Sequence, residues 1–178
     1  MSTDVYFKKE IQLRHAGHNL RLRVSQDLFS SFEVDTGTQR LLRSLLNLEP
    51  TQALRILDLG CGYGPLGLAF KAQAPERTVH MVDRDALAVD YARQNAALNG
   101  LAGVECYGSL GYDDVAAADF DLILINVPAK AGPPVIAHLL QDAVHLLRPG
   151  GIVAIVVVTA LEPLAADLLA QPGIELRW

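Results

Sequence analysis

A glycine-rich segment is the part of the sequence best suited to binding a cofactor. Residues 58–67 read Asp-Leu-Gly-Cys-Gly-Tyr-Gly-Pro-Leu-Gly. Glycine permits a positive φ and lets the backbone approach a ligand with no Cβ in between. A helix expected from Pro65 would direct its first amide groups and the positive end of its dipole at that ligand. Gly62, Gly64 and Gly67 also fit the G-x-G-x-x-G spacing of dinucleotide-binding loops, so the loop alone does not select one cofactor.

Two aspartates narrow the chemistry of this loop. Asp58 ends the strand before the glycines, where its carboxylate could hold the ammonium group of S-adenosylmethionine. Asp83 ends the next strand, where its two oxygens could accept hydrogen bonds from both ribose hydroxyls. An acid at this point also suits NAD, so Asp83 indicates an adenosine-type ribose without choosing the cofactor. The structural alternative is that each acid only caps the loop or helix beside it, but two acids around one glycine loop favour the binding interpretation.

The segments around the loop alternate between strands and helices. Strands and helices that alternate at these intervals predict an α/β fold with a doubly wound, mostly parallel, Rossmann-like sheet. The last strand is apolar on both faces, as in a central strand covered by helices. Ligands of such sheets bind beyond the carboxyl ends of the strands, where the glycine loop lies. The expected strands are 55–59, 78–83, 104–107, 120–126 and 152–158, and the expected helices are 65–74, 85–98 and 134–147.

The sequence before this core predicts a β-hairpin and one further helix. Residues 11–15 and 20–24 alternate apolar and polar side chains around a turn at 16–19. Residues 35–38 then open a helix. Its expected core-facing residues are Leu41, Leu42, Leu45 and Leu46.

Composition limits the class of protein. The 178 residues are 51% hydrophobic and 20% charged, which suits one soluble globular domain. The longest apolar run, 152–161, is about half of the ~20 residues that cross a bilayer, and the N-terminus carries no signal-peptide stretch. Cys61 and Cys106 lack partners at metal-ligand spacing. We therefore expect a cytoplasmic, metal-free, single domain over residues 1–178, with the hairpin and lead-in at 1–34 and a cofactor-binding core at 35–178.

Charge is distributed unevenly along the chain. The net charge is −5, yet residues 1–25 hold five bases and two acids, against ten bases and eighteen acids in the remainder. A basic segment of this kind either contacts nucleic-acid phosphates or forms a solvated face, and the solvated face is the commoner outcome.

Two motifs resemble a known family. Residues 58–64 match the cofactor loop of class I S-adenosylmethionine-dependent methyltransferases. Residues 29–38, Phe-Ser-Ser-Phe-Glu-Val-Asp-Thr-Gly-Thr, resemble the lead-in of the "methyltransferase small" family, which includes ribosomal RNA guanine-N2 methyltransferases and related archaeal proteins. The similarity runs from about Tyr6 to the end of the chain. It implies a Rossmann-like methyltransferase sheet, S-adenosyl-L-methionine as cofactor, and a lead-in that closes over the pocket.

The resemblance also implies which residues bind the cofactor. The family often carries an acid after the third strand that contacts adenine, where this chain has Gly108, Ser109 and Leu110. Ser109 would then accept the hydrogen bond from the adenine amine, less strongly than an anion. The implied cofactor-binding residues are Thr38, Asp58, Gly60, Cys61, Gly62, Tyr63, Asp83, Arg84, Ser109, Leu110 and Asn126.

The family's catalytic signature is Asn-Pro-Pro followed by an aromatic or large apolar residue. Here residues 126–132 read Asn-Val-Pro-Ala-Lys-Ala-Gly. The resemblance implies that the side-chain oxygen of Asn126 and the backbone carbonyl of Pro128 accept two N–H groups of an exocyclic amine, which aims the nitrogen lone pair at the methyl group. Pro128 would stiffen that carbonyl by fixing φ. Methyl transfer of this kind requires no strong base.

Val127 and Ala129 depart from the signature and leave several functions open. An aromatic at 129 would stack on a base for ~1–3 kcal/mol, which alanine does not supply. Three interpretations remain. The enzyme methylates a guanine amine of ribosomal RNA, with another side chain covering the base. Alternatively, it methylates a small molecule or another amine, or it binds the cofactor with little activity. The hypothesis of an NAD-dependent oxidoreductase is supported only by the glycine spacing. The sequence offers no Tyr-x-x-x-Lys pair for hydride chemistry. A non-enzymatic module that positions RNA or another subunit is the remaining alternative.

The end of the sequence predicts an incomplete sheet edge. The family sheet usually finishes with an antiparallel hairpin, of which residues 174–178 can supply only the first strand. The apolar strand at 152–158 would then have an open edge. We expect that a partner subunit covers it in a homo-oligomer, that the chain end pairs with it, or that the chain is shortened.

Overall fold

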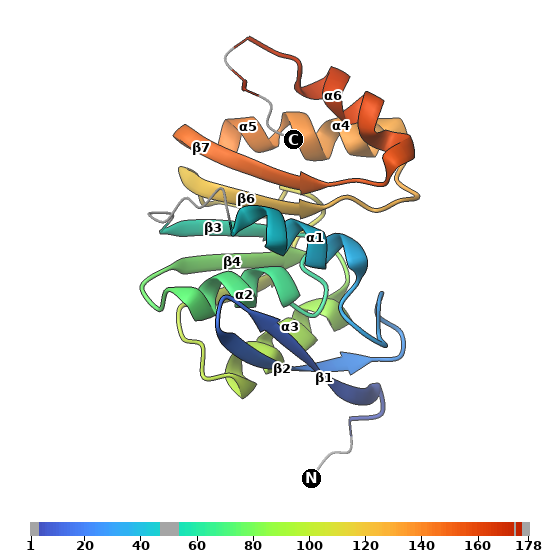
Figure 1. Ribbon diagram of the computed structural model, residues 1–178, viewed down its shortest axis with the longest axis vertical. Helices are drawn as coiled ribbons and strands as arrows, with labels where there is room; N and C mark the ends of the chain where they lie inside the picture. The colour runs from blue at the N-terminus through green and yellow to red at the C-terminus, as the bar shows by residue number, and fades with distance from the viewer. Residues whose placement is uncertain (1–3, 47–53, 173, 176–178) are drawn as a thin grey trace.

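The computed structural model describes residues 4–46, 54–172 and 174–175 of the chain. A five-stranded sheet in the order β5-β4-β3-β6-β7 forms its centre (Figure 1). All neighbouring strands pair in parallel, which confirms the predicted Rossmann-like α/β fold. The strands are β3 (Arg55–Leu59), β4 (Thr78–Asp83), β5 (Val104–Gly108), β6 (Phe120–Asn126) and β7 (Leu147–Val156).

Helices cover both faces of the sheet. Successive residues of β3 show why, since Ile56 belongs to one buried apolar cluster and Leu57 to another on the opposite face. Strands of a parallel sheet must be apolar on both sides when helices pack on each face. The helices α1 (Thr36–Leu45), α2 (Pro65–Gln73) and α3 (Ala86–Leu98) contribute to the first cluster. The second cluster receives α4 (Pro133–Gln141), α5 (Ala143–Leu146) and α6 (Glu162–Leu169), which follows a 3-10 turn at Thr159–Leu161.

The predicted N-terminal hairpin is present as a separate two-stranded sheet. Strands β1 (Phe7–His15) and β2 (His18–Ser25) pair antiparallel. Their turn is shorter than expected, because only Ala16 and Gly17 connect the strands, with φ of 46° and 81°. Positive φ at both central residues matches the right-handed twist of the two strands.

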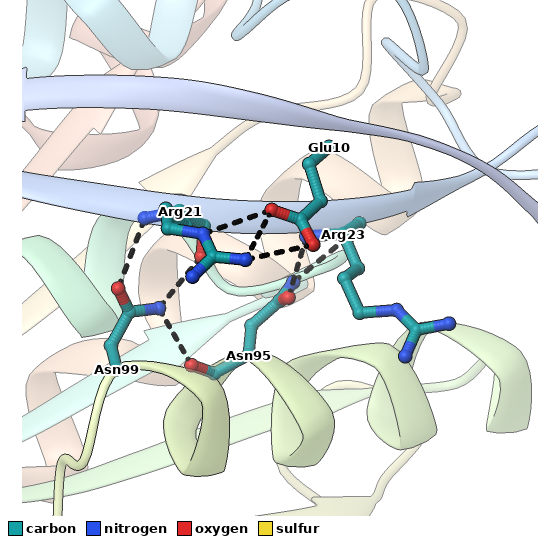
Figure 2. A network of polar contacts seen from close by, with 5 residues as sticks. All are labelled: Glu10, Arg21, Arg23, Asn95 and Asn99. Atoms are coloured by element: carbon teal, nitrogen blue, oxygen red, sulfur yellow. Dashed lines mark hydrogen bonds and ion pairs between the residues drawn. The ribbon is translucent and has the colours of Figure 1, made fainter.

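Side chains at the end of α3 and at its C-cap, Asn99, hold the hairpin on the domain by pairing with the backbone of β2 as a neighbouring strand would (Figure 2). Asn95 accepts from the amide of Arg23 at 2.7 Å and donates to the carbonyl of the same residue at 3.0 Å. Asn99 repeats the pattern on Arg21, at 3.0 and 2.7 Å. Asn95 is fully buried and also donates to the carbonyl of Tyr63, at 2.9 Å. One amide therefore connects the hairpin backbone with the glycine loop.

The segment from 133 to 156 differs from the sequence prediction. The expected helix over 134–147 ends as α4 at Gln141 and continues only as the short α5. The residues expected as a turn belong to β7, since Leu147 already pairs with Phe120. Gly151 lies so close to that strand that a Cβ would sit 2.8 Å from the Phe120 carbonyl. Gly151 therefore allows close strand contact, whereas Gly150 supplies a positive φ of 78°, and the sequence does not separate these roles from those of a turn.

Two expectations about burial are also corrected. Leu46, expected in the core stripe of α1, is 44% exposed, because α1 ends at Leu45. In the described part of the chain β7 is an edge strand rather than a central one, and only its Ala154 is buried. No strand among the described residues pairs with the outer edge of β7, and residues 176–178 lie outside the description. None of the described helices is long and apolar enough to cross a membrane.

Candidate active site

The carboxyl ends of β3, β4, β5 and β6 bring the sequence-predicted residues to one edge of the sheet. The glycine loop follows β3, and Asp83 ends β4 next to it, with one carboxylate oxygen 2.9 Å from the amide nitrogen of Gly62. Ser109 follows β5, and its amide donates to the carbonyl of Asp83 at 3.0 Å. Asn126 ends β6. This is the edge at which ligands of doubly wound sheets bind.

The glycine loop leaves its outer side open for a ligand. The amides of Gly60 and Cys61 both donate to the carbonyl of Val82, at 2.8 and 2.9 Å, which fixes the loop against β4. Gly60 and Gly62 have φ of 73° and 55°, and a Cβ on either would meet nothing within 4 Å. The backbone therefore has the conformation and the free space that close approach of a cofactor requires.

The carboxylate of Asp83 is held in a fixed orientation. Besides accepting from Gly62, it accepts from the amide of Asp85 at 3.0 Å through its other oxygen. Each carboxylate oxygen can accept more than one hydrogen bond, so both remain able to bind a pair of ribose hydroxyls. The side chains of Arg84 and Leu110 are exposed on the same rim, Leu110 by 63%.

Asp58 lies beneath the loop rather than at its surface. Its side chain is 1% exposed and accepts from the amide of Gly67, at 2.8 Å, at the start of α2. Burial raises the pKa of Asp58 to about 7, nearby Asp83 adds to the rise, and the Gly67 hydrogen bond opposes it. Gly67 is required for this contact, because a Cβ there would lie 2.8 Å from Cγ of Met81. An ammonium group bound nearby would favour the ionised carboxylate.

The raised pKa of Asp58 predicts a pH dependence of stability. Between about pH 4 and pH 7 the folded protein retains a proton on Asp58 that the unfolded chain has lost, so the free energy of unfolding decreases as the pH rises through this interval. Asp58→Asn keeps an acceptor for the Gly67 amide and has no charge to bury. Urea unfolding at a series of pH values should show a downward slope for the parent that is smaller in the variant. Identical slopes would contradict the burial of an ionisable group at this position.

Cys61 and Tyr63 contribute backbone rather than side-chain chemistry to the loop. Both side chains are buried, at 4% and 3% exposure. Burial raises the pKa of the Cys61 thiol well above its usual range, so the thiol is neutral and unreactive. No cluster of three metal-ligating side chains occurs among the residues described.

The hydroxyl of Ser109 is already used within its own turn. It donates to the carbonyl of Gly111 at 2.8 Å and accepts from the amide of Asp114 at 3.1 Å. The side chain is only 5% exposed. One lone pair of this oxygen remains able to accept a hydrogen bond from an adenine amine, but the turn already fixes its orientation, which the sequence did not indicate.

Asn126 is fixed by the lead-in to α1. Its side-chain nitrogen lies 3.2 and 3.1 Å from the two carboxylate oxygens of Asp35 and 3.1 Å from the hydroxyl of Thr38. Asp35 caps α1 by accepting from the amides of Gly37 and Thr38. The lead-in therefore reaches the predicted catalytic side chain. The family resemblance implied that residues 29–38 close over the pocket, but it did not single out Asp35, because nothing in the local pattern relates this residue to one 91 positions later.

Some backbone groups of the loop after Asn126 already form hydrogen bonds within the protein. Val127 is buried, and its amide donates to the carbonyl of Val156 at 3.0 Å. The carbonyl of Pro128, expected to accept from the substrate amine, accepts from the amide of Ala131 at 2.9 Å. Only its second lone pair is available to a substrate. Ala129 and Lys130 are exposed.

Comparisons with known proteins agree with this arrangement. Residues 19–170 match the model of a family described as the methyltransferase small domain. The protein YbxB of Bacillus subtilis is 37% identical over 131 residues, which are 73% of this chain and 64% of YbxB. Ribosomal RNA small subunit methyltransferase C of Haemophilus influenzae is 35% identical over 142 residues, 78% of this chain and 42% of that protein.

A solved structure extends the similarity to the fold. The T. thermophilus 16S rRNA N2 methyltransferase in complex with AdoMet and guanosine superposes with a TM-score of 0.77 and 26% identity. The match covers 90% of this chain and 45% of that protein. The chain thus spans less than two thirds of the length of each of these three proteins.

Proposed function

The chain belongs to the methyltransferase small domain family, and from this membership we propose that it is an S-adenosylmethionine-dependent methyltransferase acting on an exocyclic amine such as guanine N2 in ribosomal RNA. The observation that carries the proposal is the side chain of Asn126, whose nitrogen is bound by Asp35 and Thr38. Its oxygen is left to accept an N–H group at the edge where a cofactor binds. The similarity to a ribosomal RNA N2 methyltransferase with bound guanosine supports the choice of amine.

The residues of the chain supply position rather than acid–base chemistry. S-adenosylmethionine, when bound, supplies a methyl group on a positively charged sulfur. The backbone of the glycine loop and the carboxylate of Asp83 would hold its amino-acid and ribose parts. Asn126 would accept one N–H of the amine, which turns the nitrogen lone pair toward the methyl group and restricts the approach to an in-line geometry. The amine proton can leave to water after transfer, so no buried base is required.

Binding and turnover measurements on the parent protein test the proposal. Isothermal calorimetry should detect S-adenosylmethionine and S-adenosylhomocysteine and no NAD. Tritium from the labelled cofactor should then appear in protein-free ribosomal RNA. Binding of NAD alone would instead indicate the oxidoreductase, and label in small amines but not in RNA would indicate a small-molecule enzyme. Cofactor binding without any transfer would support the non-enzymatic module.

The surface around the start of the hairpin supports a contact with RNA. The two arginines of β2 are neutralised, since Arg21 pairs with Glu10 and Arg23 with Asp4. The lysines of β1 have no ion pair among the described residues and instead surround the exposed ring of Phe32. Lys8 lies 3.1 Å and Lys9 5.3 Å from the ring centroid, and Phe32 is 71% exposed. Cations beside an exposed aromatic are the usual combination for single-stranded nucleic acid.

A groove extends this surface along α1. It has a volume of about 550 Å³ and lies beside the hairpin rather than over the glycine loop. Arg14 and Arg43 both line it and are exposed. Phe32 precedes Asp35 by three residues, so their Cα atoms are at most about 11 Å apart. Nucleotides bound at Phe32 would therefore lie close to the amine held by Asn126.

Replacing the two lysines should weaken RNA binding through its electrostatic part. For Lys8→Gln with Lys9→Gln, the negative slope of log K against log salt concentration should decrease in magnitude by about 1.4, since each single-strand phosphate contact contributes about −0.7. Phe32→Ala should lower the affinity by roughly 1–3 kcal/mol without changing the slope. Fluorescence titration of an RNA oligonucleotide at several salt concentrations measures both. Arg21→Gln is the matched control, because Arg21 is already paired, and an equal loss there would contradict a specific surface.

Three expectations accompany the proposal. We propose that residues 1–178 act as one methyltransferase domain in the cytoplasm, with the hairpin and lead-in at 1–34 serving RNA and the core at 35–178 serving the cofactor. A homo-oligomer that covers the outer edge of β7 stays a prediction. Sizing chromatography that shows only a monomer would contradict it.

A further inference from the structure

The amide group of Asn126 is surrounded by acceptors on its nitrogen side. Both oxygens of Asp35 lie within 3.2 Å of this nitrogen, and the hydroxyl oxygen of Thr38 lies 3.1 Å from it. A primary amide has two N–H donors, so Asp35 and Thr38 together use both of them. Asn126 is half-buried at this point, and its contacts come from an element that precedes it by 88 to 91 residues.

The hydrogen-bond directions allow one orientation of this amide. The Thr38 hydroxyl donates to Asp35, so toward Asn126 it can act only as an acceptor. A rotated amide would place its oxygen against the carboxylate of Asp35, where two acceptors face each other without a proton. The backbone amides of Gly37 and Thr38 fix the carboxylate itself, at 2.9 and 3.2 Å.

Gly37 packs against one side of the amide, next to its oxygen. A Cβ at Gly37 would lie 3.1 Å from the side-chain oxygen of Asn126 and 3.4 Å from a methyl group of Val156. The first turn of α1 therefore packs directly against the Asn126 side chain. Rotation of the amide about its last bond is opposed by packing as well as by hydrogen bonds.

We propose that Asp35 is the positioning residue of the methyl-transfer site, which orients Asn126 so that its oxygen faces the substrate. The inference rests on the proposed function and adds a selectivity to it. A site that presents an oxygen acceptor binds a nitrogen that bears N–H and disfavours a keto oxygen, which would meet another acceptor. The negative charge of Asp35 also polarises the amide and strengthens its oxygen as an acceptor. Asp35 itself touches no reacting atom.

Asp35→Asn separates positioning from helix capping. Asparagine caps a helix as well as aspartate, so the variant should retain α1 and its unfolding midpoint. Its NH₂ group would face the NH₂ of Asn126, which favours rotation of Asn126. We expect kcat for tritium transfer to ribosomal RNA to fall about 10- to 100-fold, with KM for RNA and the affinity for S-adenosylmethionine unchanged. Asp90→Asn is the matched control, because it removes the charge of an exposed aspartate of α3 whose side chain bonds to Gln94 and not to Asn126.

A reciprocal exchange tests whether the two residues act together. In Asp35→Asn with Asn126→Asp, the new amide at 35 can donate to a carboxylate at 126, whose second oxygen still faces the substrate. Asn126→Asp alone brings two carboxylates together and should lose both stability and activity. We expect the double variant to be more active than either single variant. If the fold-loss of kcat in the double variant equals the product of the fold-losses in the two single variants, the residues act independently and the inference is overturned.

A spectroscopic measurement separates this inference from the proposed function. In ¹⁵N-labelled parent protein the side-chain amide protons of Asn126 should exchange slowly with solvent, and Asp35→Asn should make them exchange fast. If exchange is slow in the parent and fast in the variant, the positioning role is supported. This holds even if the parent methylates no RNA, because that result would contradict the proposed function alone. Unprotected amide protons in the parent, or full kcat in Asp35→Asn, would overturn the inference.

Discussion

Replacing Asn126 by alanine is expected to lower kcat by about 10²- to 10³-fold, the usual cost of removing one hydrogen-bonding group that acts on the reacting atoms. The amine would keep its surroundings but lose the acceptor that orients its lone pair, and misorientation alone is costly in a reaction governed by geometry. Single-turnover transfer of tritium to ribosomal RNA measures the chemical step directly.

The affinity for S-adenosylmethionine separates this effect from damage to the site. The cofactor loop and Asp83 form their hydrogen bonds without Asn126, so calorimetry should give the parent affinity for the variant. Asn19→Ala, in the exposed part of the hairpin, controls for the loss of an asparagine elsewhere. Parent-like turnover in Asn126→Ala would remove the observation on which the proposed function rests.

Local sequence signals were sufficient to predict where the helices α1, α2 and α3 begin and where the strands β3, β4 and β6 end around the site. Asp85 stands before an apolar pattern and does cap α3, and Asp35 does cap α1. Pro65 begins α2 as expected, because its fixed φ suits the first helical position. The strand ends then follow from the parallel order, which places Asp83 and Asn126 at one edge.

The hydrogen-bond partners of the site residues could not be predicted from the local sequence pattern. Asp35 has the sequence of an ordinary cap, and its contact with Asn126 depends on how α1 packs beside β6. Ser109 has the sequence of a free hydroxyl, yet its turn uses it. Pro128 likewise satisfies its carbonyl within the loop, at Ala131. The contact of Asp35 is decided by where a second segment lies, whereas the contacts of Ser109 and Pro128 are decided by the conformation of their own turns. The residue type and its spacing encode neither.

The missing aromatic at Ala129 is easier to explain with the structure in view. Ala129 is exposed beside Pro128, so an alanine there leaves open space rather than a packing defect. Exposed apolar side chains occur elsewhere along the chain, with Phe29 at 80%, Phe32 at 71% and Leu110 at 63% exposure. Phe29 and Phe32 precede Asp35 by only a few residues, so we expect one of these two rings to cover a base in place of a side chain at 129.

The second large effect is expected for Asp83→Ala, which should weaken binding of S-adenosylmethionine and S-adenosylhomocysteine by about 10²- to 10⁴-fold. Two charge-assisted hydrogen bonds to ribose would be lost, each contributing roughly 1.5–3 kcal/mol. The amides of Gly62 and Asp85 would also lose their acceptor, so the glycine loop would be held less firmly. Calorimetric titration with both ligands measures the loss.

Two further variants show whether lost contacts with the two ribose hydroxyls cause the loss of affinity in Asp83→Ala. Asp83→Asn keeps one acceptor oxygen and should bind with intermediate affinity, because its hydrogen bonds to ribose are no longer assisted by a negative charge. Asp90→Ala removes an exposed acid of α3 that bonds only to Gln94 among the described residues, and should leave binding unchanged. An Asp90 loss equal to that at Asp83 would indicate a general effect of charge on a cationic cofactor. Parent-like affinity in Asp83→Ala would place the ribose elsewhere along the edge, and with it the position from which a methyl group must reach Asn126.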